Sequence, residues 1–339
     1  MRIGLAFNLK RVKPAVGGAF DEEAEYDSPT TVAAIREAIS TLGHEVIDLE
    51  ATRSFPQALL AATPDVVFNL AEGIEGSSRE AHVPALLELL GVPYTGSGPA
   101  SMVLTLDKAV AKAIVRDAGL PTPRSIVMYT GDEALPPDLS LPAIIKPVAE
   151  GSSKGVLPAS VVTSEVALRD LARTMATRYG QGALVEEYLP GREFTVAVLG
   201  EPAVALPPME VVFREGLELP VYSFDHKLEP NSEVRYEAPA RISDGLDIEL
   251  RSLALRAFSV LGCRDVGRVD LRLDCHGRPS FIECNPLPGL SPGWSDLCLV
   301  AEAAGIDYHK LIARILEPAL GRARAAADRK IAPGAAASV

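Results

Sequence analysis

Apolar and polar positions along the first third of the chain follow a strand-then-helix rhythm. Apolar runs predict strands at residues 3–7, 45–49 and 65–70, and the last is apolar almost throughout, as buried parallel strands are. Between and after them, apolar positions at helical spacing predict helices at 28–42 and 79–90. This order predicts a doubly wound βαβ unit, in which ligands meet the loops at the carboxyl ends of the strands.

The remaining two thirds of the chain contain two further units. The pattern predicts helices at 107–118, 164–179, 247–261 and 306–316, and strands at 124–128, 143–146 and 184–187. Tyr188-Leu189-Pro190-Gly191 has the composition of a hinge between these units. We therefore predict an α/β fold with three domains and a frayed, alanine-rich tail, at residues 1–103, 104–190, 191–320 and 321–339.

Two strands near the C-terminus carry the most specific polar pattern. Polar and apolar residues alternate over 267–274 and again over 281–286, and residues 275–279 supply the reversal between them. On paired strands, Asp270, Glu283 and Asn285 can project from one face toward a common point. Two carboxylates and an amide oxygen are ligands typical of Mg²⁺. A solvated hairpin face is the alternative, and the strongly apolar flanking residues favour the metal site.

Composition and charge narrow the class of function. With 339 residues, 47% of them hydrophobic and 23% charged, the chain is typical of a globular protein with two or three domains. A net charge of −12 argues against a nucleic-acid partner. No apolar run approaches the length of a membrane span, and the chain opens on a strand and not on a secretory signal. Four cysteines without Cys-x-x-Cys spacing indicate a reducing compartment, so we expect the cytoplasm and no membrane partner.

A lysine and a glycine- and serine-rich loop suggest a site for phosphates. Lys146 ends an apolar strand, and the loop Glu150-Gly151-Ser152-Ser153-Lys154-Gly155 follows it. Backbone N–H groups and hydroxyls at this density can wrap an anion, so we predict a lid over a triphosphate; a flexible surface turn is the alternative. Lys108, in the first turn of a helix, also points to an anionic partner. The chain has no Walker loop and no dinucleotide fingerprint.

The strand at 184–187 and the hinge after it could hold a nucleoside. The backbone of this segment could pair with a planar base, while the carboxylate of Glu193 accepts a hydrogen bond from a ribose hydroxyl. A solvated hinge explains the same acidic residues equally well.

Together these segments resemble the ATP-grasp superfamily, and within it the D-alanine–D-alanine ligase branch. The matching motifs stand in the family's order: Leu89-Leu90-Gly91-Val92-Pro93-Tyr94-Thr95-Gly96-Ser97-Gly98, Leu106-Asp107-Lys108, Lys146-Pro147, Glu150-Gly151-Ser152-Ser153, Glu193-Phe194-Thr195-Val196, Gly267-Arg268-Val269-Asp270, Glu283-Cys284-Asn285 and Pro288-Gly289. The resemblance runs from about residue 65 to 316. It implies a three-domain ATP-grasp fold that is α+β in its ATP-binding half, with ATP gripped between the second and third domains.

The resemblance also implies roles for individual residues. ATP would be bound by Lys108, Lys146, Ser153, Lys154, Glu186, Glu187, Tyr188, Leu189, Glu193 and Lys227. Asp270, Glu283 and Asn285 would carry two Mg²⁺ ions, which Mn²⁺ could replace. Arg268 and the Gly289 N–H would stabilise an oxyanion, and Ser152 would lie near the first substrate. Enzymes of this family are commonly dimers through the first domain, so the resemblance implies a homodimer.

The substrate end of the chain departs from the family pattern. After the first strand comes a longer acidic loop, residues 8–27, in which Glu23 or Glu25 could hold a substrate ammonium; a solvated acidic turn is the alternative. Glu72 stands in place of a family histidine, and Ser291 lies in a segment that replaces a serine-rich one. We therefore predict substrates other than two D-alanines.

The predicted function is an ATP-dependent carboxylate–amine ligase. It would join amino acids, or a related small carboxylate and amine, through an acylphosphate and release ADP and phosphate. The alternatives are a true D-alanine–D-alanine ligase of peptidoglycan synthesis, a non-catalytic ATP-binding regulator, and a kinase-like enzyme that stops at the phosphorylated carboxylate. The intact set Lys146, Arg268, Asp270, Glu283 and Asn285 argues against the regulator.

Overall fold

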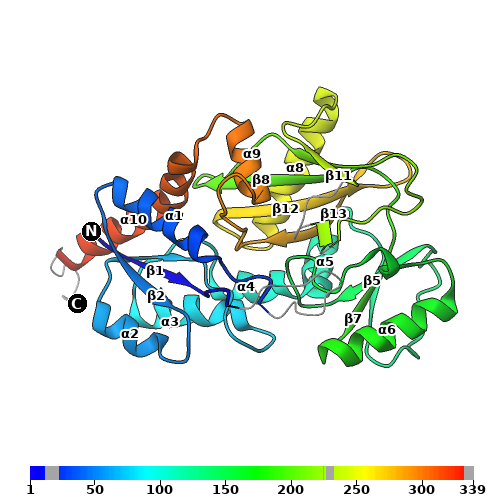
Figure 1. Cartoon of the computed structure of the whole chain (residues 1–339), viewed down its shortest axis with the longest axis horizontal. Coiled ribbons are helices and arrows are strands. Elements are labelled where there is room, and N and C mark those ends of the chain that lie inside the picture. Colours follow the sequence, from blue (N-terminus) through cyan, green and yellow to red (C-terminus); the bar gives the residue numbers. More distant parts are fainter. Residues whose placement is uncertain (12–22, 224, 227–232, 332–339) are drawn as a thin grey trace, which may run out of the picture.

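The computed structural model describes residues 1–11, 23–223, 225–226 and 233–331. The strands of this part form three sheets, joined by helices that pack on their faces (Figure 1). Within the same part of the chain, no helix is both long enough and apolar enough to span a membrane.

The N-terminal sheet is parallel and has the strand order β2-β1-β3. Its strands are β1 (Arg2–Phe7), β2 (Glu45–Glu50) and β3 (Val66–Asn69). Apolar side chains of α1 (Pro29–Thr41) and α10 (Tyr308–Ile331) pack on one face, and those of α2 (Phe55–Ala62) and α3 (His82–Leu90) pack on the other (Figure 1). Helices on both faces of a parallel sheet confirm the predicted doubly wound unit.

Helix α10 shows that the predicted C-terminal tail begins too early. We expected a helix over 306–316 and a frayed segment from residue 321, but the helix continues to Ile331. Arg322 donates from Nη1 to Asp265 Oδ1 at 2.9 Å and from Nη2 to the Tyr94 carbonyl at 2.8 Å. Alanine has the highest helix propensity, so the alanine-rich sequence extends the helix, and these contacts join it both to the first unit and to β12 of the third sheet, Asp265–Leu273.

The middle sheet is antiparallel, with the order β4-β7-β5-β6. Its strands are β4 (Ser125–Met128), β5 (Ala143–Pro147), β6 (Val161–Val162) and β7 (Ala183–Glu187). Helix α6 (Glu165–Tyr179) buries its apolar face against these strands, and a short 3-10 turn, η2 (Pro158–Ser160), precedes β6.

The third sheet is also antiparallel and follows the order β11-β10-β8-β12-β13, with β9 paired to β8. Its strands are β8 (Glu193–Gly200), β9 (Val204–Ala205), β10 (Met209–Phe213), β11 (Val234–Glu237), β12 (Asp265–Leu273) and β13 (Pro279–Asn285). Helices α5 (Lys108–Asp117) and α8 (Asp244–Val260) cover one face, while α9 (Asp296–Ala303) lies near the first unit. Antiparallel sheets with helices packed on them confirm the α+β second half.

Two helices differ from the prediction. Residues 79–90 form not one helix but a 3-10 turn, η1 (Arg79–Ala81), followed by α3. A helix that we did not predict, α4 (Pro99–Leu106), begins directly after the glycine-rich segment that ends at Gly98. Proline is well tolerated in the first helical turn, where its missing N–H would have no partner, so Pro99 starts this helix and does not prevent it.

Candidate active site

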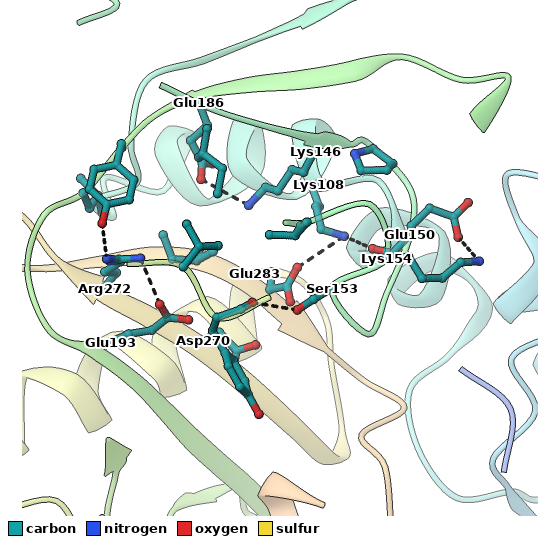
Figure 2. Close-up of a pocket in the computed structure, with 18 of the residues that line it drawn as sticks. Lys108, Lys146, Glu150, Ser153, Lys154, Glu186, Glu193, Asp270, Arg272 and Glu283 are labelled. Atoms are coloured by element: carbon teal, nitrogen blue, oxygen red, sulfur yellow. Dashed lines mark hydrogen bonds and ion pairs between the residues drawn. The ribbon is translucent and has the colours of Figure 1, made fainter. Parts of the chain in front are cut away.

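A pocket between the middle and third sheets contains the predicted nucleotide-binding residues. Its lining includes Lys108, Lys146, Ser153, Lys154, Glu186, Glu187, Tyr188, Leu189 and Glu193. In Figure 2, Lys108 and Lys146 face Asp270 and Glu283 across this pocket. Lys227, the remaining predicted ATP ligand, lies outside the described residues.

At one end of the pocket, a buried carboxylate forms ion pairs with two lysines. Glu186 Oε1 lies 3.3 Å from Lys146 Nζ, and its Oε2 lies 2.5 Å from Lys112 Nζ. Burial would raise the pKa of Glu186, but the charges of the two lysines outweigh it and lower that pKa. Burial lowers the pKa of Lys112 to about 8. Sequence reasoning missed Lys112, although it follows Lys108 by four residues and so shares its helix face.

The serine loop has an unusual backbone conformation. Ser152 and Ser153 have φ angles of 50° and 56°, which non-glycine residues rarely adopt. Backbone strain of this kind clusters at ligand clamps, because consecutive N–H groups can then converge. The Lys154 Nζ lies 2.7 Å from Glu150 Oε2, and the Lys154 side chain is buried. These contacts fix the loop, so the alternative of a flexible surface turn is not supported.

The candidate metal ligands converge on the hairpin of β12 and β13. Asp270 pairs with Glu283 across the hairpin, and a β-bulge follows this pair. The Asn285 Nδ2 lies 3.3 Å from Asp270 Oδ2 and 3.5 Å from Glu283 Oε1. Lys108 Nζ lies 3.4 Å from Glu283 Oε2 and balances part of its charge.

This set has the donor chemistry of a magnesium site. Asp270 and Glu283 offer carboxylate oxygens, and a half-turn of the Asn285 amide would add its carbonyl oxygen. Elsewhere in the described ranges, no cluster of three or more His, Cys, Asp or Glu side chains could hold a metal ion. The residues therefore fit Mg²⁺, and their role as its ligands remains a prediction.

Arg268 and the Gly289 N–H are the two predicted oxyanion donors. Arg268 donates to Asp270 Oδ2 at 2.8 Å and to Asp296 Oδ2 at 3.0 Å, so its guanidinium is held by a carboxylate on either side. Burial would lower the pKa of Arg268, but the charges of Asp270 and Asp296 outweigh it and raise that pKa. The Gly289 N–H has no hydrogen-bond partner among the described residues. Both residues line one large cavity.

This second cavity has a volume of about 610 Å³ and also contains the predicted substrate residues. Glu25, Glu72, Ser152 and Ser291 all line it. The volume lies within the usual range for small-molecule sites. The Ser291 hydroxyl is hydrogen-bonded to Thr31 Oγ1 at 2.7 Å, so it also ties the cavity wall to α1.

Glu25 is not part of a solvated acidic turn. Its side chain is 6% exposed and lies 3.0 Å from Arg79 Nη2. Its Oε1 accepts the Gly151 N–H at 2.5 Å, which connects this acidic segment to the serine loop. Such long-range contacts cannot be deduced from the spacing of acidic residues along the chain.

Three further carboxylates surround Glu25, and sequence reasoning missed two of them, Asp27 and Glu80. Burial raises the pKa of Asp27 to about 7. Burial, with the nearby charge of Glu25, raises the pKa of Glu80 to about 8. Glu72, which we did single out, has a pKa raised by burial and by the charge of Glu80. Near neutral pH the protein therefore retains protons on this wall that its unfolded chain would lose.

The raised pKa of Glu80 predicts a pH-dependent stability. Its ordinary pKa is 4.5, so between that value and about 8 the unfolded chain has lost a proton that the folded protein keeps. The free energy of unfolding should therefore fall as pH rises from about 6 to 8, by up to about 1.4 kcal/mol per pH unit from this group. Urea unfolding at several pH values should show a shallower fall for Glu80→Gln. The control Glu75→Gln, whose side chain is 71% exposed, should match the parent. Equal slopes for all three proteins would contradict this prediction.

Known proteins resemble this chain in sequence and in fold. Residues 114–317 match the model of the D-ala D-ala ligase C-terminus family. A D-alanine–D-alanine ligase of Moorella thermoacetica is 35% identical over 90% of this chain and 97% of its own length. The chain belongs to the D-alanine–D-alanine ligase family. An uncharacterized Sinorhizobium fredii protein, y4sG, is 41% identical over 86% of each chain. The fold resembles that of a D-alanine–D-alanine ligase of Bacillus anthracis solved with ATP, with a TM-score of 0.73, 23% identity, and coverage of 96% of this chain and 99% of that one.

Membership in this family identifies the class of reaction and confirms the resemblance found in the sequence. The protein is an ATP-grasp enzyme and an ATP-dependent ligase that joins a carboxylate to an amine. The predicted fold class is also confirmed. The roles of the individual site residues and the three domain boundaries remain predictions.

Proposed function

We propose that the protein joins two amino-acid-like substrates through an acylphosphate, in the cavity that adjoins its nucleotide pocket. One observation carries this proposal: the two spaces share a wall. Asp270 lines the nucleotide pocket, Arg268 and Asn285 line the larger cavity, and both are hydrogen-bonded to Asp270. A carboxylate in the cavity would therefore lie beside the phosphates.

The side chains at this wall support a two-step reaction. A substrate carboxylate oxygen would attack the γ-phosphorus of ATP and release ADP, with Lys108 and Lys146 neutralising the phosphates. The substrate amine would then attack the carbonyl carbon, and phosphate and a proton would leave. Arg268 and the Gly289 N–H would donate to the carbonyl oxygen as negative charge develops on it. Mg²⁺ on Asp270, Glu283 and Asn285 would supply further positive charge at the phosphates.

We propose substrates other than two D-alanines, because the acidic wall around Glu72 departs from the family pattern. True D-alanine–D-alanine synthesis is the second candidate. The Moorella relative, which carries that name and aligns over almost its whole length, favours it.

A screen for ADP release would test the proposal. The protein with ATP and Mg²⁺ would be supplied with L- and D-amino acids, singly and in pairs, and mass spectrometry would identify the products. Hydroxylamine in place of the amine would trap an activated carboxylate as a hydroxamate. The absence of both ADP and hydroxamate with every amino acid would overturn the proposal, and D-alanine as the preferred substrate would establish the second candidate.

We expect ADP release to require a divalent cation. EDTA should abolish it, and Mg²⁺ or Mn²⁺ should restore it, because Asp270 and Glu283 offer only oxygen ligands. A binding measurement separates this role from catalysis. ATP with Mg²⁺ should raise the melting temperature of the parent protein, and Glu283→Gln should lose most of this metal-dependent increase. An unchanged increase in this variant would remove Glu283 from the site.

We also propose a cytoplasmic homodimer formed through the first unit. Leu60 on α2 and Leu89 on α3 are exposed apolar side chains on that unit, which supports an interface there. All four cysteines are free, which supports a reducing compartment. Light scattering of the parent protein and of Leu89→Lys would test the interface, since a dimer held through α3 should dissociate in the variant.

A further inference from the structure

One wall of the substrate cavity carries a concentration of carboxylates. Glu25 and Asp27 lie just before α1, Glu72 follows β3, and Glu80 lies in η1. All four line the cavity, and the charges of Glu25, Asp27 and Glu80 all act on Glu72, so the groups lie close together. We call Asp27, Glu72 and Glu80 the acidic corner.

Glu25 differs from the acidic corner because it already has partners. Arg79 binds Glu25 at 3.0 Å and also donates to the Ala149 carbonyl at 3.1 Å. Lys10, the other cation on this wall, donates from Nζ to the Ala24 carbonyl at 3.0 Å, although its charge still attracts that of Asp27. The cations of this wall are therefore engaged with Glu25 and with backbone groups.

The carboxylates of the acidic corner have no such partners. Among the described residues, none donates a hydrogen bond to the side chains of Asp27, Glu72 or Glu80, and none forms an ion pair with them. Glu80 is only 7% exposed, yet it lines the cavity. Burial without a partner favours the protonated form of these groups, and a bound cation would favour their ionised form.

The position of the acidic corner indicates which part of an amino-acid substrate would bind there. It adjoins Glu25, whose Oε1 accepts the N–H of Gly151, the residue before Ser152 in the serine loop. Arg268 and Gly289 line the same cavity. An amino acid whose carboxylate faces the phosphates beside Arg268 would extend its other end toward the N-terminal wall. Glu25 suits its α-ammonium, which leaves the acidic corner for the side chain.

We propose that the substrate whose carboxylate is activated is a basic amino acid, and that the acidic corner binds its positively charged side chain. This inference rests on the proposed function, since it names the substrate class of the same cavity. A hydrogen bond to a charged group contributes about 1.5–3 kcal/mol, which corresponds to a preference of roughly 10- to 100-fold over an uncharged side chain.

Matched substrate pairs test the charge alone. Ornithine and norvaline share a carbon chain, as do lysine and norleucine, and each pair differs by the terminal amine. Both enantiomers of each would be supplied with ATP, Mg²⁺ and hydroxylamine, so that no acceptor amine is needed. We expect kcat/KM for hydroxamate formation to be at least about tenfold higher for the basic member of a pair. Arginine in the same assay distinguishes a guanidinium from an ammonium side chain.

Variants connect this preference to the corner. Glu72→Gln and Glu80→Gln keep the shape of the side chain and remove its ability to ionise, so each should reduce the ratio of kcat/KM between the basic and the neutral member of a pair toward unity. Glu75→Gln is the control, because Glu75 is exposed and paired with Arg53 at 2.6 Å. It should keep the full preference. Melting temperatures would verify that each variant folds.

The outcomes separate this inference from the proposed function. Equal or better use of norvaline and norleucine by the parent protein would overturn the basic substrate and leave the ligase intact. A preference that survives in both Glu72→Gln and Glu80→Gln would overturn the role of the corner. The absence of hydroxamate from every amino acid would overturn the proposed function and this inference with it.

Discussion

Replacing Arg268 by methionine is expected to lower kcat about 10²–10³-fold, with a much smaller change in KM for ATP. The reason is that Arg268 lies on the cavity wall between Asp270 and Asp296, which hold its guanidinium in place at 2.8–3.0 Å. A donor fixed in this way needs little reorganisation as charge develops on the reacting oxygen. Initial rates of ADP release at saturating substrates would measure the loss.

Two variants make the test of Arg268 specific. Arg268→Lys keeps the charge but loses the planar fork, so it should recover only part of the activity. Arg278→Met is the matched control, because Arg278 is exposed on the turn between β12 and β13 and binds Asp274 at 2.8 Å. It should keep near-parental kcat. If the folded Arg268→Met protein retained a kcat within threefold of the parent, Arg268 would not stabilise the transition state.

Replacing Glu186 by alanine is expected to lower the free energy of unfolding by about 3–5 kcal/mol. Glu186 lies between Lys112 and Lys146 in the interior, at 2.5 Å and 3.3 Å from their Nζ atoms. Removing it leaves two ammonium groups close together without a carboxylate, and neither can readily reach water. Urea unfolding at neutral pH would measure this change.

Companion variants separate charge from packing at Glu186. Lys112→Met in the Glu186→Ala background removes one of the unpaired charges, so it should restore part of the lost stability. Glu187→Ala, one residue along the chain, removes a partly exposed carboxylate that accepts the Ser140 hydroxyl at 2.8 Å. Its effect should stay below about 1 kcal/mol. A loss below about 1 kcal/mol for Glu186→Ala would mean that the lysines find other partners.

The convergence of the candidate site residues could be predicted from the sequence because its signals are local. Asp270, Glu283 and Asn285 lie on two strands joined by a short turn, so the two-residue period of a strand already places them on one face. The glycines and serines that identify the serine loop stand next to one another, within residues 151–155. Lys146 stands at the end of a strand, a position that apolar periodicity fixes.

The pairing of these groups was beyond sequence reasoning. Lys112 and Glu186 are 74 positions apart, and only the packing of α5 against the middle sheet brings them together. Glu25 and Gly151 are 126 positions apart, which is why the sequence alone left a solvated turn open as an interpretation of the acidic segment. The extension of α10 depends on Asp265, 57 positions before Arg322.

The sequence by itself determined the fold class, the family and most of the candidate site residues, because period, turn chemistry and motif order are properties of neighbouring residues. Only the tertiary structure decided which charges are neutralised and which are not. Arg79 pairs with Glu25, while the side-chain carboxyl groups of Asp27, Glu72 and Glu80 have no hydrogen-bonded partner in the described part of the chain. Burial and ion pairing depend on contacts between distant segments, and in this protein those contacts leave unpaired carboxyl groups on the cavity wall that we propose meets the substrate.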